Sequence, residues 1–337
     1  MHEVKRGTHT ADSASISVAD AGKRWINQAE ADELEASTIA QYRQHLDLHI
    51  KPFLGDVKLS RLTGPMIREF KSNLQKNGRS TAMVRKVTVS LGSIIAYALE
   101  AGLVAQNVVR DGATRKRRRN NSSGRHKAKA EIPTLKEINA FINNAEGRWR
   151  PLIITAIFTG LRASELRGLT WDAVDFGARA IRVRQRADKW NEIGPPKSKA
   201  GYREVPLAPM VVNTLREWKE ECPEGELGLV FPNGSGNVES LSNIDRRGFG
   251  PLQLKCGVWR ETGEDNPIRR RRYGMHALRH AAASLFIDQG FQPKRVQAIM
   301  GHSSIQMTFD VYGHLFPRPD DDKKAMEELQ ARLVKAA

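Results

Sequence analysis

The sequence predicts a mainly α-helical chain of two domains, with a small antiparallel β-sheet in the second domain only. Three observations lead to this prediction. The chain has 337 residues, and domains cluster near about 100–200 residues, so two folded units are expected. Apolar residues recur at helical spacing in both halves, whereas runs of strand character occur only in the second half. A polar stretch of dense positive charge separates the two halves and predicts a linker.

The predicted domain limits follow these changes along the chain. Residues 1–14 are polar and lack periodicity, which predicts a disordered tail. Residues 15–109 show no strand signal and predict an all-helical domain. Three helices are expected in it, each with apolar residues on one face. The first carries Ile39, Tyr42, Leu46 and Ile50 and ends before Gly55, and the second carries Ile67, Phe70 and Leu74 after Pro65. The third carries Val84, Val87, Leu91, Ile94 and Ala98 and ends before Gly102. Residues 110–130 are the linker, and residues 131–337 form the second domain.

The linker contains five consecutive cations, Arg115, Lys116, Arg117, Arg118 and Arg119. We interpret this run as a flexible arm that lies along DNA, because it joins two domains of an already basic protein. The alternative is a solvated connector whose charge only aids solubility. A nuclear import signal has the same local pattern.

The second domain is expected to mix helices with strands. Thr134 and Glu137 fit a capping box at the start of its first helix, and a second helix is expected over residues 152–159. Strand-like segments at residues 181–186 and 203–207 lie on either side of a turn at Ala200 and Gly201. After the second of these segments, only helices are expected.

The charge balance predicts an anionic partner. The chain carries 54 Lys and Arg against 38 Asp and Glu, a net charge of +16, and a nucleic-acid backbone is the commonest large partner of such a protein. The alternative is a basic surface that only confers solubility. No apolar run approaches the roughly 20 residues of a membrane span, and no secretory signal opens the chain, so a cytoplasmic protein without a membrane partner is expected.

Arg162 and Glu165 lie in the segment TGLRASELRGLTW, residues 159–171. A Thr-Gly turn brings Arg162 to the start of a helix, where backbone amides also favour a phosphate. Taken alone, this arginine could be an ordinary surface residue paired with Glu165 or Asp172.

Lys197 and Lys199 lie in the segment PPKSKAGYREVPL, residues 195–207, which we interpret as a β-hairpin with the lysines near its tip. An ammonium group there could protonate a leaving alkoxide as a general acid, although most hairpin lysines are simply solvated. Lys197 is the first candidate for this role. Lys199 is its rival and otherwise a candidate for DNA binding.

His276 and Arg279 share one helical face in the segment HALRH, residues 276–280. The four residues that contribute the preceding positive charge are expected to contact DNA: Arg269, Arg270, Arg271 and Arg272. A metal site on His276 and His280 is a weaker interpretation, because the zincin pattern places a glutamate directly after the first histidine and Ala277 stands there. The two cysteines are far apart and lack a Cys-x-x-Cys spacing, so no metal or other cofactor is expected.

The segment IMGHSSIQMTFDVYGHLF, residues 299–316, adds a histidine and a tyrosine. Gly301 is expected to end one helix, and His302 stands at the turn before a short helix opened by a serine. Tyr312 follows ten residues after His302. Most lone tyrosines belong to a core or a surface. The order Arg, Lys, His-x-x-Arg, Gly-His, Tyr in one domain of a basic protein is what makes this tyrosine a candidate.

Together these residues form a set that can cleave a phosphodiester without a metal. Two guanidinium groups can hold both non-bridging oxygens and neutralise the charge that grows in the transition state. Histidines supply proton transfer and a further hydrogen bond. A tyrosine nucleophile suits strand exchange, because the phosphotyrosyl ester keeps the bond energy and a DNA 5′-hydroxyl can later attack it without ATP.

The order of these motifs resembles the tyrosine recombinases of the phage integrase type, over residues 15–337. The resemblance implies a helical core-binding domain, an α+β catalytic domain and a site-specific recombinase that cuts and rejoins DNA through a 3′-phosphotyrosyl bond. The resemblance implies that Tyr312 is the nucleophile, that Arg162 and Arg279 bind the scissile phosphate, and that Glu165 supports Arg162. It further implies that Lys197 protonates the 5′-oxygen and that His276 accepts the tyrosine proton. His302 is implied to stabilise the phosphorane.

The same resemblance implies partners. Residues 15–109 are expected to clamp double-stranded DNA at attachment or recombination sites, and four protomers to assemble on synapsed DNA, with a helix at residues 323–334 docking on a neighbour. DNA-bending accessory proteins also fit this picture. Residues 1–14 are too few for the arm-binding domain that many phage integrases carry, so either the protein recognises core sites alone or this sequence is a shortened form of a longer protein. The sequence around the last motifs resembles integrases of phages and integrative elements more than chromosome-dimer resolvases.

Three other functions remain as alternatives on the sequence. A type IB topoisomerase-like enzyme shares the nucleophile and the phosphate grip but acts as a monomer that relaxes DNA. A DNA-binding regulator without catalysis is disfavoured, because all six catalytic positions are present. A metallohydrolase that uses His276, His280 and His302 lacks an acidic ligand and a base.

Overall fold

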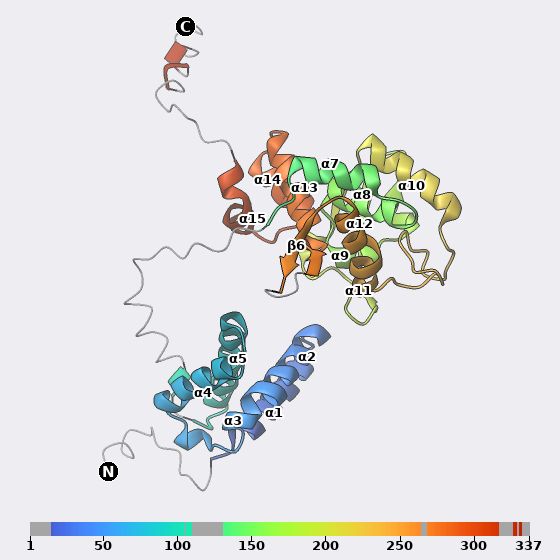
Figure 1. Ribbon diagram of the computed structural model, residues 1–337. Helices are drawn as coiled ribbons and strands as arrows, with labels where there is room; N and C mark the ends of the chain where they lie inside the picture. Colours follow the sequence, from blue (N-terminus) through green and yellow to red (C-terminus); the bar gives the residue numbers. More distant parts are fainter. Residues whose placement is uncertain are drawn as a thin grey trace. The chain divides into compact units, whose positions relative to one another are not determined.

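The computed structural model describes residues 15–104, 106–109, 131–263, 268–316, 326–328 and 330–331. The chain divides into two compact units, Met1–His126 and Lys127–Ala337 (Figure 1). Three predicted segments lie outside the described residues: the tail at 1–14, the linker at 110–130 with its basic run, and most of the helix at 323–334. Within that last segment, the described residues 326–328 and 330–331 are helical.

The regular elements described in the first unit are all helices. They are α1 (Val18–Ala31), α2 (Ala36–His45), a π-helical turn (Leu46–Ile50), α3 (Lys51–Leu54), a 3-10 turn (Leu59–Arg61), α4 (Gly64–Lys76) and α5 (Thr81–Glu100). The three helical stretches predicted from periodicity are confirmed, since α2 continues through the π-helical turn and α3 as far as Gly55. Helix α1 was not predicted individually. Its local signal is Ser17, whose hydroxyl accepts a hydrogen bond from the backbone N–H of Asp20.

Helix α5 provides much of the core of this unit. It contacts α1, α2 and α4, and Val87, Leu91 and Ile94 on its inner face are fully buried. Among the described residues, α5 alone is long and apolar enough to cross a membrane by length and composition. In this unit neighbouring helices cover its apolar face, and 39% of its most apolar 18-residue stretch is buried.

The second unit is also mainly helical. Its helices are α7 (Leu135–Asn144), α8 (Trp149–Thr159), α9 (Ala163–Arg167), α10 (Pro209–Glu221), α11 (Leu241–Asn243), a π-helical turn (Ile244–Phe249), α12 (Gly250–Lys255), α13 (His276–Asp288), α14 (Pro293–Met300) and α15 (Ile305–Tyr312). The capping box is confirmed at α7, where the Thr134 hydroxyl and the Glu137 carboxylate each accept from the other's backbone N–H. Helix α8 packs against α7, α10 and α13, so its nearly continuous apolar sequence is buried on all sides.

Short antiparallel strands lie beside these helices. Strands β1 (Val174–Asp175), β2 (Ala180–Val183) and β5 (Arg203–Pro206) form one sheet in the order β1-β2-β5, and β3 (Arg186–Ala187) pairs with β4 (Ile193–Gly194). The two predicted strand-like segments contain β2 and β5, which pair with Ile181 opposite Val205. The expected hairpin over residues 195–207 is wrong in detail. Because β5 pairs with β2 and not with β4, the segment carrying both lysines connects two different small sheets.

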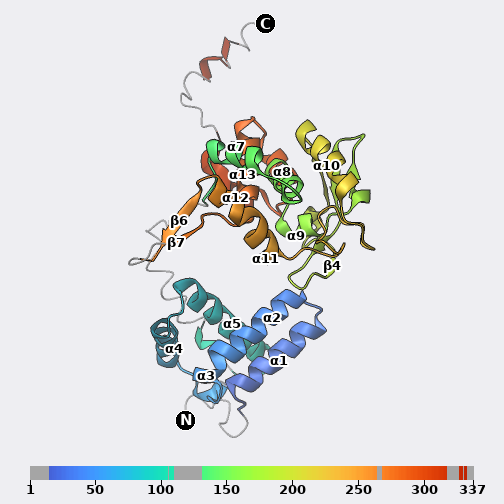
Figure 2. The same cartoon turned by 45° about the vertical axis from the view of Figure 1, so that its right-hand side comes forward.

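A further hairpin contradicts the expectation of helices alone after residue 207. Strands β6 (Trp259–Thr262) and β7 (Ile268–Arg271) pair antiparallel and extend from the helices of this unit (Figure 2). These strands were not predicted because the second one consists largely of arginines in place of the β-branched residues typical of strands. Cross-strand contacts compensate, since the guanidinium of Arg269 lies 4.3 Å from the ring centroid of Trp259.

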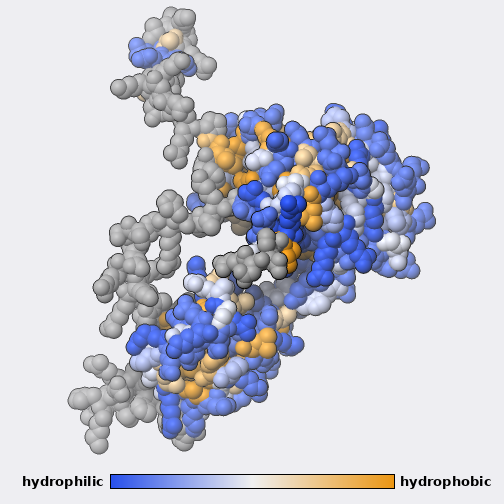
Figure 3. All heavy atoms as spheres, in the orientation of Figure 1, coloured by the Kyte–Doolittle hydropathy of each residue, from blue (hydrophilic) through white to orange (hydrophobic). Residues whose placement is uncertain are grey.

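The visible surface of the second unit is mostly hydrophilic, with an apolar area over α15 (Figure 3). Met307 and Phe309 of this helix expose 43% and 44% of their surface. The opposite face of α15 packs on α14 and buries Thr308 and Tyr312. The amphipathic helix therefore directs Tyr312 into the unit.

Candidate active site

Two helix ends supply carbonyl groups to the site. Helix α8 ends at Gly160 and α14 ends at Gly301, and both glycines adopt a left-handed φ, of 62° and 64°. A Cβ atom at Gly160 would lie 2.8 Å from Met300 Sδ, and one at Gly301 would lie 2.8 Å from the carbonyl oxygen of Ala200. Glycine is therefore required at both ends. The last carbonyls of a helix lack partners within it, and the negative end of the helix dipole favours cations there.

Arg162 is anchored to one of these carbonyls and to Glu165. Its Nη2 donates to the carbonyl oxygen of Gly301 at 2.9 Å, and its Nη1 donates to Glu165 Oε1 at 2.8 Å. The backbone N–H of Arg162, which precedes α9, donates to Glu165 Oε2. The side chain remains 32% exposed. A ligand can therefore still reach the guanidinium group.

Glu165 is buried and shared between two arginines. Arg203 of β5 donates to both of its carboxylate oxygens, from Nη1 at 3.0 Å and from Nη2 at 2.8 Å. Burial by itself would raise the pKa of Glu165, but the hydrogen bonds and charge of Arg203, followed by those of Arg162, lower this pKa to about 2. Glu165 is therefore ionised throughout the physiological range.

Arg203 was missed by the sequence analysis. Its Nε donates to the carbonyl oxygen of Ile299 at 2.6 Å, and only 6% of its side chain is exposed. A signal was present, because Arg203 alternates with Val205 and Leu207, which are both buried. The two-residue period of a strand places an arginine on that same inner face.

Arg279 is the most deeply buried cation of the site. It lies on α13 and is 3% exposed. Nη1 donates to the carbonyl oxygen of Gly160 at 2.6 Å, and Nη2 donates to the carbonyl oxygen of Met300. Burial, followed by the charge of Arg162, lowers the pKa of Arg279 to about 9, so it stays protonated at neutral pH.

These residues leave an excess of positive charge inside the protein. Arg162, Arg203 and Arg279 influence one another electrostatically, and Glu165 is the carboxylate that pairs with Arg162 and Arg203 at this centre. Isolated buried charge is costly unless it is paired. An anion that reaches Arg162 would restore the balance, so the arrangement fits a site for a phosphate or a similar group.

His302 lies beside these arginines at the end of α14. Its Nδ1 is 2.9 Å from Thr308 Oγ1, and the residue is 7% exposed. Burial, followed by the charges of Arg279 and Arg162, lowers the pKa of His302 to about 4. The ring is therefore neutral at pH 7. Because Thr308 engages Nδ1, Nε2 is the ring nitrogen left for another partner.

Tyr312 ends α15 within the unit, 2% exposed. Its ring stacks nearly parallel to His302, with centroids 6.3 Å apart, and its Oη lies 2.7 Å from Nδ1 of His280. Burial raises the pKa of Tyr312 to about 12, although the charge of Arg279 acts in the opposite direction. The hydroxyl is therefore protonated at neutral pH and needs help to become a nucleophile.

His276 begins α13 and meets His280 edge-on, with ring centroids 4.7 Å apart. Desolvation, followed by the charges of His280, Arg279 and Arg162, lowers the pKa of His276 to about 4. The side chain is exposed by surface area, so water weakens the first of these effects. The arginine charges act in the same direction, and the ring is neutral at pH 7 in either case.

Lys197 and Lys199 lie in the connection between β4 and β5. Both are exposed. The connection is held by close packing, because a Cβ atom at Gly201 would lie 2.4 Å from Pro196 Cβ. The geometry does not distinguish the two lysines as the general acid.

The four expected DNA-binding arginines before α13 have different surroundings. Arg271 forms an ion pair with Asp245 at 2.8 Å, and Arg272 lies 3.6 Å from Glu137. Arg269 covers Trp259. Arg270 is exposed and stands opposite Arg260 on the other strand of the hairpin. The alternation of a strand therefore gives the hairpin one basic face with these two residues.

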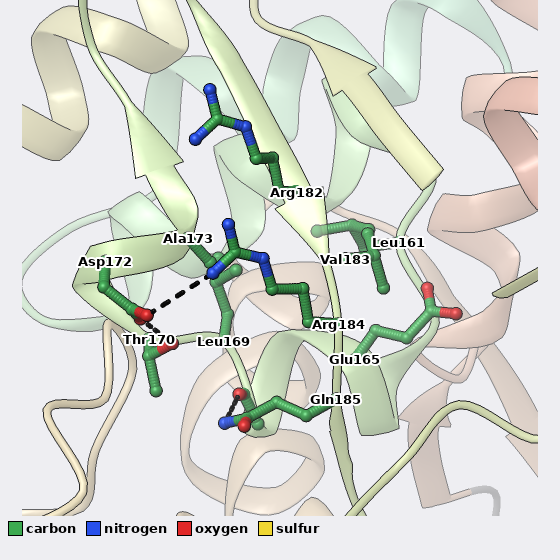
Figure 4. Close-up of a pocket in the computed structure, with 11 residues that line it drawn as sticks. Leu161, Glu165, Leu169, Thr170, Asp172, Ala173, Arg182, Val183, Arg184 and Gln185 are labelled. Atoms are coloured by element: carbon green, nitrogen blue, oxygen red, sulfur yellow. Dashed lines mark hydrogen bonds and ion pairs between the residues drawn. The ribbon is translucent and has the colours of Figure 1, made fainter. Parts of the chain in front are cut away.

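A small pocket behind Glu165 is distinct from the cluster. Figure 4 shows the Glu165 carboxylate pointing away from Arg182 and Arg184 of the neighbouring β2 segment, both of which line this pocket. Arg184 lies 3.7 Å from Asp172, and Arg182 lies 2.8 Å from Asp175. These arginines are paired at the surface and do not share the Glu165 network.

The structure also bears on the weaker metal interpretation. No group of three or more His, Cys, Asp or Glu side chains is arranged to hold a metal ion in the part of the chain that is described. Nδ1 of His280 is engaged by Tyr312, and Nδ1 of His302 by Thr308. The three histidines are thus placed around a tyrosine and two arginines.

Comparison with known proteins connects this geometry to a family. A model of the phage integrase family matches residues 133–318, and a model of the phage integrase N-terminal SAM-like domain matches residues 19–75. The tyrosine recombinase XerC-like protein of Caldanaerobacter subterraneus subsp. tengcongensis is 25% identical, over 94% of this chain and 84% of its own length.

Solved structures share the fold. The Tn1549 transposon integrase in complex with a circular intermediate DNA is similar with a TM-score of 0.73 at 19% identity, over 94% of this chain and 100% of that chain. The lambda integrase tetramer bound to a Holliday junction is similar with a TM-score of 0.62 at 17% identity, over 87% of this chain and 79% of that chain.

The family match covers more than half of the chain, including the whole cluster from Arg162 to Tyr312. It confirms the family that the order of the motifs predicted. This chain belongs to the phage integrase family, and it is a tyrosine site-specific recombinase.

Proposed function

We propose that this recombinase cleaves double-stranded DNA at specific sites by attack of Tyr312 Oη on the scissile phosphorus. The attack leaves a 3′-phosphotyrosyl bond and a free 5′-hydroxyl, and a 5′-hydroxyl of a partner strand reverses it. The observation that supports this proposal most is the buried Tyr312 under the influence of Arg279, whose neighbours Arg162 and Arg203 share the carboxylate of Glu165. A phosphodiester is an anion of the size and charge that this arrangement lacks.

The other residues take roles that follow from their positions. Arg162 and Arg279 bind the non-bridging oxygens of the scissile phosphate, and Glu165 holds Arg162 in place. His302 offers Nε2 to the phosphorane. Lys197 protonates the 5′-oxygen, with Lys199 as its rival. The family resemblance assigns the acceptance of the tyrosine proton to His276 at the exposed side of the site, although His280 is the histidine in contact with Tyr312 Oη.

This chemistry needs neither a metal ion nor ATP. The guanidinium groups supply the charge stabilisation that a divalent cation gives in other phosphoryl-transfer sites. The phosphotyrosyl ester conserves the energy of the broken phosphodiester, so rejoining needs no further source of energy.

The rest of the chain suits a DNA-bound assembly. The helical unit at residues 15–109 acts as a core-binding domain, and the basic linker and the exposed pair Arg260 and Arg270 add phosphate contacts. A tetramer on synapsed DNA is supported by the lambda integrase tetramer and by the exposed apolar side chains of α15, with the helix at residues 323–334 docking on a neighbour. DNA-bending accessory proteins and a location in the bacterial cytoplasm fit the mobile-element relatives.

The test is a covalent-adduct assay. The purified protein is incubated in EDTA with a nicked suicide substrate that bears the candidate attachment site, and denaturing gels are searched for a protein–DNA adduct. We expect an adduct with the wild type and none with Tyr312→Phe, which removes one oxygen and leaves DNA binding nearly unchanged. Tight binding without an adduct in the wild type would instead identify a DNA-binding regulator.

A two-site plasmid separates the proposal from a topoisomerase. Site-specific recombination yields exchanged products whose formation depends on both sites. A type IB topoisomerase-like enzyme would yield only relaxed circles, whether or not the second site is present.

A further inference from the structure

His280 is the side chain that contacts the tyrosine hydroxyl. Its Nδ1 lies 2.7 Å from Tyr312 Oη, and the two ring centroids are 5.6 Å apart. The other histidines are placed differently. His302 faces the tyrosine ring and uses Nδ1 for Thr308, whereas the ring of His276 contacts His280.

Helix geometry explains why the second histidine of the HALRH segment makes this contact. His276 and His280 are four residues apart and lie on the same face of α13. His276 is at the exposed first turn of the helix, whereas His280 is one turn further in and half-buried. Position 280 is therefore the one that reaches the last residue of α15.

We propose that His280, and not His276, accepts the proton of Tyr312 during cleavage. The inference rests on the proposed function, because it requires Tyr312 to be the nucleophile. As the Oη–P bond forms and the P–O5′ bond breaks, the phenol proton passes to Nδ1 of His280, and the 5′-oxygen takes its proton from Lys197. In rejoining, the imidazolium returns its proton to Oη while the attacking 5′-hydroxyl gives its proton to the lysine.

The charges around His280 favour this role. Burial, followed by the charge of Arg279, lowers the pKa of His280, so the ring is neutral at pH 7 and Nδ1 can accept when Nε2 carries the ring proton. Arg279 and His276 on α13 and Tyr312 on α15 are the titratable groups that face it. The bound phosphodiester acts in the opposite direction, because its negative charge stabilises the imidazolium once it forms.

Tyr312 needs such an acceptor. Its pKa of about 12 leaves the phenol protonated at neutral pH. The oxygen becomes more acidic as its electrons move to phosphorus, so a neutral imidazole at hydrogen-bond distance can take the proton within the same step.

The test compares matched substitutions on one helix, His280→Asn and His276→Asn. The amide oxygen of asparagine can accept a hydrogen bond near the position of Nδ1 but does not bind a proton at neutral pH. Single-turnover adduct formation is measured from pH 5 to 8, at saturating protein, on a suicide substrate with a 5′-bridging phosphorothiolate. This substrate has a leaving group that needs no general acid, so the role of Lys197 drops out of the rate.

We expect His280→Asn to slow adduct formation by about 10²–10⁴-fold at neutral pH and to remove the acid limb of the pH–rate profile. We expect His276→Asn to retain that limb. The inference would be overturned if His280→Asn formed the adduct within threefold of the wild-type rate, or if only His276→Asn lost the acid limb of the pH–rate profile. In both cases the Tyr312-dependent adduct of the wild type would still uphold the proposed function. Absence of any adduct in the wild type would overturn both.

A second measurement separates proton acceptance from a structural effect. Replacement of Tyr312 by 3,5-difluorotyrosine makes the phenol more acidic, so a defect caused by the missing proton acceptor should shrink in the His280→Asn background. A defect caused by misfolding or by a displaced tyrosine would stay the same. An unchanged defect would therefore also overturn the inference.

Discussion

The Glu165→Gln substitution tests the charge network at the centre of the site. It keeps the size of the side chain and removes the negative charge between Arg162 and Arg203. Both arginines then lack their carboxylate partner, and Arg203 is almost fully buried. Breaking a buried ion pair at one partner is strongly destabilising because the other charge is left uncompensated.

The magnitude follows from the pKa of Glu165. The lowering of this pKa from 4.5 to about 2, at about 1.36 kcal/mol for each tenfold change in proton affinity, corresponds to about 3 kcal/mol of stability. Because the folded pKa lies below the unfolded one, this contribution is fully present above pH 4.5. It is lost as the pH falls from 4.5 towards 2, where wild-type Glu165 also becomes protonated.

Urea unfolding followed by tryptophan fluorescence measures this effect in the second unit, which holds five of the six tryptophans. We expect Glu165→Gln to lower the free energy of unfolding by about 3 kcal/mol at pH 6, and the difference from wild type to shrink as the pH falls below 4.5. A difference that stays constant with pH would refute the reasoning, because the charge of Glu165 would then not be its source. Glu192→Gln, at an exposed position, is the matched control and should change little.

Two further predictions concern the lysines and Gly301. Lys197→Ala should abolish adduct formation on ordinary DNA, and a 5′-bridging phosphorothiolate substrate should restore it. Lys199→Ala should mainly weaken DNA binding. The reverse pattern in the same gel assay would assign the general acid to Lys199. Gly301→Ala should lower the free energy of unfolding by about 1–2 kcal/mol through its left-handed backbone alone. It should also slow cleavage, since the new Cβ would lie 2.9 Å from Arg203 Nη1. An unchanged free energy of unfolding in urea and an unchanged cleavage rate would contradict this account of the turn.

Helices and their ends could be predicted well because their signals are local. The apolar spacing in α4 and α5, the capping box at Thr134 and the glycine that ends α14 all act within a few residues. The arginine-rich β6–β7 hairpin was missed, since its strands are stabilised by a partner strand and by stacking on Trp259 and not by their own composition.

The sequence by itself determined the class of fold and the family, because order and residue type along the chain carry that information, and it predicted candidates for the reactive side chains. Only the tertiary structure decided how these side chains meet. Arg203 reaches Glu165 across 38 positions, and His280 reaches Tyr312 across 32. Such contacts depend on how β5 and α15 pack in the second unit. For this reason the second arginine bound to Glu165 and the partner of the tyrosine hydroxyl emerged from the packing alone.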